Sequence, residues 1–347
     1  MDRAAVSLLL LFGLPLVALV VAPQAMLLAF AGVLLAVALR GAGDAIADRL
    51  GAPGWAGVVI VVVLVIASIA GAGIWAAGPL GEQADALAAQ LPQSASRLRD
   101  ALGGSAWGRM VAEQFSPGDM VSQLAPGAAT MATAAAARLA GGLTDVIYLL
   151  FLGVFLAVAP RDYLDGLCAL VAPGLRDRCG PVLLALGRAL RAWVAAQLLA
   201  MAIVGVLTFT GLWLLGVQLA GILAVVAALL GFIPILGPIM AAVPALLLAT
   251  TEGWTMVAWV AGLYMTVQVI EGDLVTPLVQ SRAIRLPPGL ILLAQVLMLA
   301  LFGLFGLALA APLAAVLLVL GQRLYVRGYL EGRGAPAGRG PGPAAGD

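Results

Sequence analysis

Two uncharged apolar blocks, residues 219–250 and 289–320, constrain the fold of this chain more than any other feature. Each runs for 32 residues and is interrupted near its middle by Gly, or by Gly and Pro. A straight helix of this length would span about 48 Å, against about 30 Å for a hydrocarbon core, while two complete passes would need about 40 residues. Each block is therefore predicted to form two short helices that meet at a break. Broken backbone at membrane depth is tolerated against protein or a water-filled cavity, and paired broken segments indicate a transport pathway.

The composition indicates a membrane protein. Of 347 residues, 63% are hydrophobic and 10% are charged, and the mean hydropathy is +1.11. These values predict an all-α, polytopic helical membrane protein. A net charge of +1 argues against a nucleic-acid partner, because such proteins concentrate basic charge on one face. The chain has no His, so a proton relay would have to use Asp or Glu, and neither a His metal site nor a cofactor is expected.

Apolar runs predict about six full membrane spans besides the two broken blocks. The spans fall at residues 4–22, 25–39, 55–77, 143–159, 193–216 and 253–272. The resulting regions are N-terminal spans (1–77), an extracytoplasmic loop of short helices (78–142), a transport core (143–330) that includes a cytoplasmic loop (160–192), and a disordered tail (331–347). In the cytoplasmic loop, Pro173-Gly174 and Gly180-Pro181 are expected to punctuate two short amphipathic helices.

The positions of Arg predict the orientation. With a cytoplasmic N-terminus, the outside keeps only four Arg, all in the long 78–142 loop that the positive-inside rule largely exempts. Both termini are therefore expected in the cytoplasm, in a bacterial inner membrane, and the two broken blocks become opposed hairpins that enter from opposite faces. Cys168 and Cys179 then share one cytoplasmic loop without CxxC spacing, so they are expected to be free structural thiols.

Both breaks carry candidate binding residues. In the first block, Phe232, Pro234, Gly237 and Pro238 form the break, where each Pro removes a backbone donor and disfavours helix at the preceding residue. Freed carbonyls and a new helix N-terminus would then be available to a polar solute or cation. The alternative is a structural kink between packed helices.

The second block has no Pro at its break. Its candidates are Gly303 and Gly306, in the sequence Leu-Phe-Gly-Leu-Phe-Gly. The alternative is that these glycines only allow close helix packing.

The third candidate segment lies at the membrane end of the 253–272 span. It contains Gln268, Glu271 and Asp273, and acids in such a place are functional hypotheses by default. The alternative is an interfacial acid pair that forms salt bridges with Arg282 or Arg285. Two other acids, Asp145 and Glu252, fall at outer span ends, where solvated capping explains them.

The order of these motifs resembles the autoinducer-2 exporter family, also called the PerM-like permeases, over roughly residues 4–325. The resemblance rests on Arg191-Ala192-Trp193 through Gln197, Leu215-Gly216-Val217, Ile233-Pro234, Gly237-Pro238, Val243-Pro244-Ala245, Gln268 to Glu271 with Pro277, Leu301-Phe302-Gly303, Gly306 and Ala310-Ala311-Pro312-Leu313. It implies about eight membrane segments, no nucleotide hydrolysis, small-molecule export or cation/proton antiport, and a homo-oligomer. Two positions depart from the family pattern: Gly272 replaces an Asn, and Pro287-Pro288 replaces a His-Pro.

Together these features predict a secondary-type transporter whose translocation site combines the two breaks with residues 268–273. Its partners would be membrane lipids, further copies of the chain, and a small polar solute such as a furanosyl signal, or a monovalent cation or proton. The first alternative is a sodium/proton antiporter that uses Glu271 or Asp273 as the exchanging carboxylate. The second is a non-transporting membrane scaffold. An ATP-driven pump is excluded for this chain alone, because no P-loop Gly-Lys-Ser/Thr is present.

Overall fold

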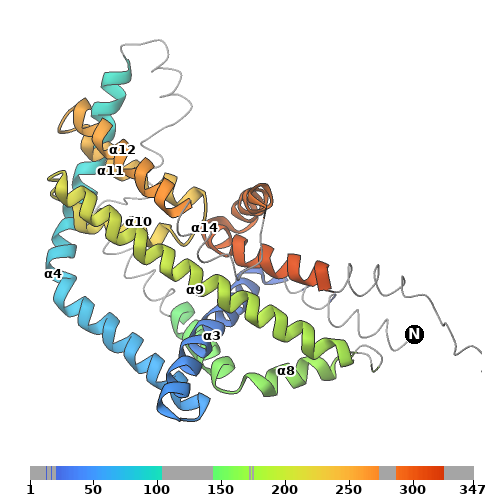
Figure 1. The fold of residues 1–347 in the computed structure, drawn as a ribbon. Helices are drawn as coiled ribbons and strands as arrows, with labels where there is room; N and C mark the ends of the chain where they lie inside the picture. Colours follow the sequence, from blue (N-terminus) through green and yellow to red (C-terminus); the bar gives the residue numbers. More distant parts are fainter. Residues whose placement is uncertain are drawn as a thin grey trace, which may run out of the picture.

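The computed structural model describes residues 21–103, 144–171, 176–272 and 287–323, together with 13, 17 and 173. Within these ranges the regular elements are helices: α3 (Pro23–Leu50), α4 (Gly54–Gly103), a helix at Thr144–Val158, α8 (Pro160–Ala169), α9 (Arg176–Leu214), α10 (Ala220–Leu230), α11 (Leu236–Ala249), α12 (Trp254–Ile270) and α14 (Pro288–Leu320) (Figure 1). The all-α prediction is confirmed for this part of the chain. The expected first span, the loop beyond residue 103, Asp273 and the tail lie outside the described residues.

Several helices are apolar enough to cross a membrane. By length and composition, three described helices qualify: α3, α9 and Pro288–Arg323. A fourth crossing would combine Thr144–Val158 with α8, which are bent by 86° at their junction. The helices α10, α11 and α12 are apolar but shorter. A helical membrane protein is thereby supported, whereas the prediction of six full spans is not confirmed.

The helices α3 and α4 form a tight hairpin. Pro23 begins α3, where its missing N–H costs no helical hydrogen bond. The helix ends at Gly51, whose φ of 65° is the left-handed conformation that glycine adopts at helix ends. Beyond the turn, a Cβ at Gly57 would collide with the carbonyl of Gly43. The two helices therefore cross at a contact between glycine backbones, which no larger residue would allow.

The helix α4 continues without a break from Gly54 to Gly103. The prediction of separate short helices is therefore wrong for residues 78–103, which continue α4. The extension is stabilised by tertiary contacts: Leu87 and Leu91 pack into the same core as Leu223 and Leu248. In addition, the Gln83 side-chain oxygen accepts the Ile222 backbone N–H at 3.1 Å. This contact anchors the start of α10 on α4.

The helix α9 runs through the centre of the molecule, with α3 and α8 toward one end and α10, α11 and α12 toward the other (Figure 1). Near its middle, Leu190 and Val194 pack with Met298 of α14. At its far end, Leu212 is fully buried in the core that α10, α11 and α12 share. The helix also continues through Pro181, so the predicted break at Gly180-Pro181 is wrong.

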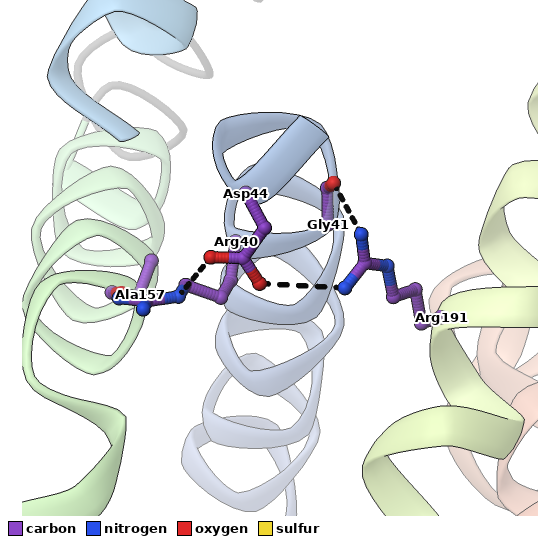
Figure 2. A network of polar contacts seen from close by, with 5 residues as sticks. All are labelled: Arg40, Gly41, Asp44, Ala157 and Arg191. Atoms are coloured by element: carbon purple, nitrogen blue, oxygen red, sulfur yellow. Dashed lines mark hydrogen bonds and ion pairs between the residues drawn. The ribbon is translucent and has the colours of Figure 1, made fainter. Parts of the chain in front are cut away.

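A polar network joins three helices at the end of α3 (Figure 2). Asp44 pairs with Arg40 at 2.8 Å on the same helix and with Arg191 of α9 at 3.3 Å. Arg191 also donates to the Gly41 carbonyl at 2.6 Å, and Arg40 donates to the Ala157 carbonyl at 3.2 Å. Because each guanidinium also binds a backbone carbonyl, the network positions α9 and Thr144–Val158 against α3.

Cys168 and Cys179 form a disulfide between α8 and α9, so the prediction of free thiols is wrong. Their Cα atoms lie 5.7 Å apart, within the range that a disulfide spans. Nearby, Arg176 donates hydrogen bonds to the carbonyls of Ala169 and Val171. These bonds join the start of α9 to the end of α8, the two helices that carry the cysteines.

Candidate functional site

The first break is a strained turn between α10 and α11. The Leu236 N–H donates to the Pro234 carbonyl at 2.8 Å, which closes a three-residue γ-turn around Ile235. Ile235 has φ 69° and ψ −60°. Positive φ is rare for a β-branched residue and marks backbone strain. Such strain is retained only where the surrounding contacts enforce it, and it is frequent at functional sites.

Two glutamines from different helices hold this break. Gln197 of α9 donates its side-chain amide to the Gly231 carbonyl at 2.5 Å. Gln295 of α14 is fully buried and donates its amide to the Pro234 carbonyl. The carbonyls at the break, which the interrupted helix leaves without regular donors, are thus hydrogen-bonded to neutral amides.

Two further contacts fix the shape of the break. The ring of Phe232 meets Trp193 of α9 edge to face, with ring centroids 5.7 Å apart. At the start of α11, a Cβ on Gly237 would collide with the carbonyl of Leu230. Gly237 therefore lets α11 begin directly against the end of α10.

A small cavity lies beside this break, between α9, α10, α11 and α12. It has a volume of about 10 Å³, enough for about one water molecule. Its polar lining groups come from Thr208, Tyr264, Gln268 and Glu271, and Pro238 borders it. The hydroxyls of Thr208 and Tyr264 are buried and have no hydrogen-bond partner among the described residues.

The second break is at Gly303, inside α14. Gly303 has φ 65° and ψ −154°, a conformation that is essentially restricted to glycine. Three residues later, a Cβ at Gly306 would collide with the carbonyl of Met298. Gly303 therefore permits the break, and Gly306 permits the second part of α14 to pack close to the first.

The predicted site residues that the structure describes lie in three separate places. Pro234 belongs to the strained turn, and Phe232 and Gly237 lie on either side of it. Pro238, Gln268 and Glu271 surround the small cavity. Gly303 and Gly306 lie at the separate break in α14, and Asp273 lies outside the described residues.

Sequence reasoning missed several polar residues that contact these places. They are Thr208, Tyr264 and Gln295, while Gln197 entered only through the family resemblance. The available signal was an uncharged polar side chain inside a long apolar segment. Gln295 and Thr208 both fit that description.

Comparison with known proteins identifies the family of this chain. A family model described as AI-2E family transporter matches residues 7–325. YrrI of Bacillus subtilis, provisionally named a transport protein, is 34% identical over 128 residues, which cover 37% of this chain and 36% of YrrI. PerM of Escherichia coli K12, provisionally named a permease, is 28% identical over 192 residues, which cover 52% of each chain. The chain thus matches about half or less of the length of these relatives. Since the family model covers nearly the whole sequence, this chain belongs to the AI-2E transporter family.

Proposed function

We propose that this protein is a secondary-type transporter of the bacterial inner membrane, which exports a small polar solute through a path at the first break. The supporting observation is the strained turn at Ile235, whose neighbouring carbonyls bind the amides of Gln197 and Gln295. Interrupted helices that offer backbone polar groups at membrane depth are the usual form of a transporter binding site.

The chemistry of this turn favours a neutral solute. The groups that meet there are two carboxamides and two backbone carbonyls, which exchange hydrogen bonds without a fixed charge. A solute rich in hydroxyls, such as a furanosyl signal, could replace one of these amide–carbonyl bonds by bonds of its own. The turn would then be released from α9 or α14 when solute binds.

Counterflow in proteoliposomes tests this function. Vesicles that contain the purified full-length protein are loaded with unlabelled furanosyl solute, and uptake of labelled solute is compared with that of empty vesicles. Accumulation that depends on the protein and on the internal solute is expected. Absence of counterflow for every polar solute tried, with a protein that unfolds cooperatively on heating, would contradict the proposal.

A sodium/proton antiporter is the second candidate, because of the small cavity beside Pro238. Its lining combines the Glu271 carboxylate with the Thr208 and Tyr264 hydroxyls, an oxygen-rich set in an apolar helix bundle. Oxygen ligands of this kind suit a small hard cation or a proton-carrying water. Glu271→Gln would then abolish sodium flux under a pH gradient, whereas Glu252→Gln, an exposed acid at the other end of α12, would leave it unchanged.

The proposal also includes the orientation of the protein in the membrane and its oligomeric state. With the Arg-rich ends inside, both termini lie in the cytoplasm, and the two broken segments enter from opposite faces. The side chains of Trp259, Met265 and Leu293 are large, apolar and exposed. Such surfaces suit lipid or a further copy of the chain, so we include a homo-oligomer in the proposal.

A further inference from the structure

A second cavity among the described residues lies apart from the first break. It has a volume of about 600 Å³ and is open on one side. It lies where three segments meet: the start of α3, the start of Thr144–Val158 and the break in α14. A volume of this size lies within the range of sites for small organic ligands.

Among the described residues that line this cavity, one carboxylate is the only charged group. It belongs to Asp145, in the first turn of Thr144–Val158, and the amide of Gln24 also lines the cavity. Asp145 is half-buried and forms no ion pair with any described residue. A carboxylate in a mainly apolar cleft attracts a cation that can also donate hydrogen bonds.

The rest of the described lining is apolar and in part aromatic. Phe302 and Phe305 line the cavity on either side of the Gly303 break, together with Leu301. Aromatic rings bind organic cations through the ring face and bind their hydrocarbon parts by apolar contact. A ligand with both an ammonium group and a hydrocarbon body therefore matches the two kinds of lining group.

We propose that this cavity binds a small amphipathic organic amine, with its ammonium group at Asp145 and Gln24 and its hydrocarbon body against Phe302 and Phe305. Because Phe302 and Phe305 flank the Gly303 break, the bound amine contacts both sides of the break. In the proposed orientation the cavity opens on the outer side. Binding of the amine does not depend on the proposed transport function. Only the further assignment of the amine as a second class of transported solute rests on that function.

Binding to the purified full-length protein in detergent tests this site without any flux measurement. The probes are phenethylamine, which is cationic at pH 7, and its neutral counterpart 2-phenylethanol, titrated by calorimetry at constant ionic strength. Phenethylamine should bind at least tenfold more tightly than 2-phenylethanol. Asp145→Asn should weaken amine binding at least tenfold and leave 2-phenylethanol binding unchanged.

Two further variants test whether amine binding depends on the carboxylate of Asp145. Asp145→Glu keeps the charge and should bind the amine within about threefold of wild type, whereas Glu252→Gln, an acid outside the cavity, should bind like wild type. Equal binding of both probes, or unchanged amine binding by a folded Asp145→Asn protein, would overturn the proposal. Failed counterflow of polar solutes with intact amine binding would contradict only the proposed transport function.

Discussion

Gln295 donates its side-chain amide to the carbonyl of Pro234, and this bond joins the first part of α14 to the turn between α10 and α11. The other polar atom of Gln295, its side-chain oxygen, is buried without a hydrogen-bond partner among the described residues. A fully buried amide that is only half satisfied is costly, so its retention points to a role at the turn.

Replacing Gln295 by Met should slow transport while changing stability little. The substitution keeps the length of the side chain, removes one hydrogen bond and also removes the unsatisfied oxygen, so the free energy of unfolding should change by less than about 1 kcal/mol. Initial counterflow rates should fall about fivefold, because the turn loses its connection to α14. Gln218→Leu, at an exposed position between α9 and α10, is the matched control and should transport normally. A wild-type rate in Gln295→Met would show that this bond has no part in transport.

The strain at Ile235 can be measured by substitution. Ile235→Gly should raise the free energy of unfolding by about 1 kcal/mol, because glycine adopts φ 69° without steric cost. Ile239→Gly, in the helical part of α11, should lower it by about the same amount. Ile235 is less exposed than Ile239, 39% against 61%, so lost packing reduces the gain expected for Ile235→Gly. Thermal unfolding in detergent gives the sign of each change in the free energy of unfolding. Destabilisation by both substitutions would argue against strain at the turn.

The small cavity should contain a water molecule or an ion. It has room for one, and two hydroxyls that line it otherwise have no partner among the described residues. Thr208→Val and Tyr264→Phe should therefore each lower the free energy of unfolding by about 1 kcal/mol. If the cavity were dry, removing an unsatisfied hydroxyl would raise stability instead. Thr210→Val controls for the change of residue type on α9, since the Thr210 hydroxyl is exposed and bonds to the Val206 carbonyl.

The predicted orientation can be tested at two exposed positions. Ser96 lies on the distal part of α4, and Gly166 lies on α8 with open space around it. In a background with Cys168→Ser and Cys179→Ser, an impermeant maleimide added to intact cells should label Ser96→Cys and spare Gly166→Cys. After the cells are permeabilised, both should react. Labelling of Gly166→Cys in intact cells would show that the orientation is the opposite of the predicted one.

The sequence predicts the breaks well because their causes are local. Pro234 and Pro238 lack the backbone donor that a helix needs, and Gly303 adopts a conformation that other residues avoid. What holds the first break in place is not local, because Gln295 and Pro234 are separated by 61 positions in the chain. No periodicity or spacing indicates that contact.

Two of the wrong predictions failed because context outweighed a general tendency. The change from apolar to polar composition near residue 78 suggests the end of a helix, but packing of Leu87 and Leu91 against α10 and α11 extends α4 to Gly103. The expected cytoplasmic location of Cys168 and Cys179 suggests free thiols, but the return of the chain into α9 brings the two residues within bonding distance. In both places tertiary contacts decide the local structure.

The length of α4 has a mechanical consequence. The helix is fixed near one end, where Gly57 contacts Gly43 of α3, and it contacts α10 about 50 Å away, near Leu91. If α4 moved as a unit about Gly57, a rotation of about 5° would displace the region near Leu91 by up to about 4 Å, roughly the rise of three helical residues. A slight rocking of the α3–α4 crossing would then shift the base of the α10–α11 segment by most of a helical turn.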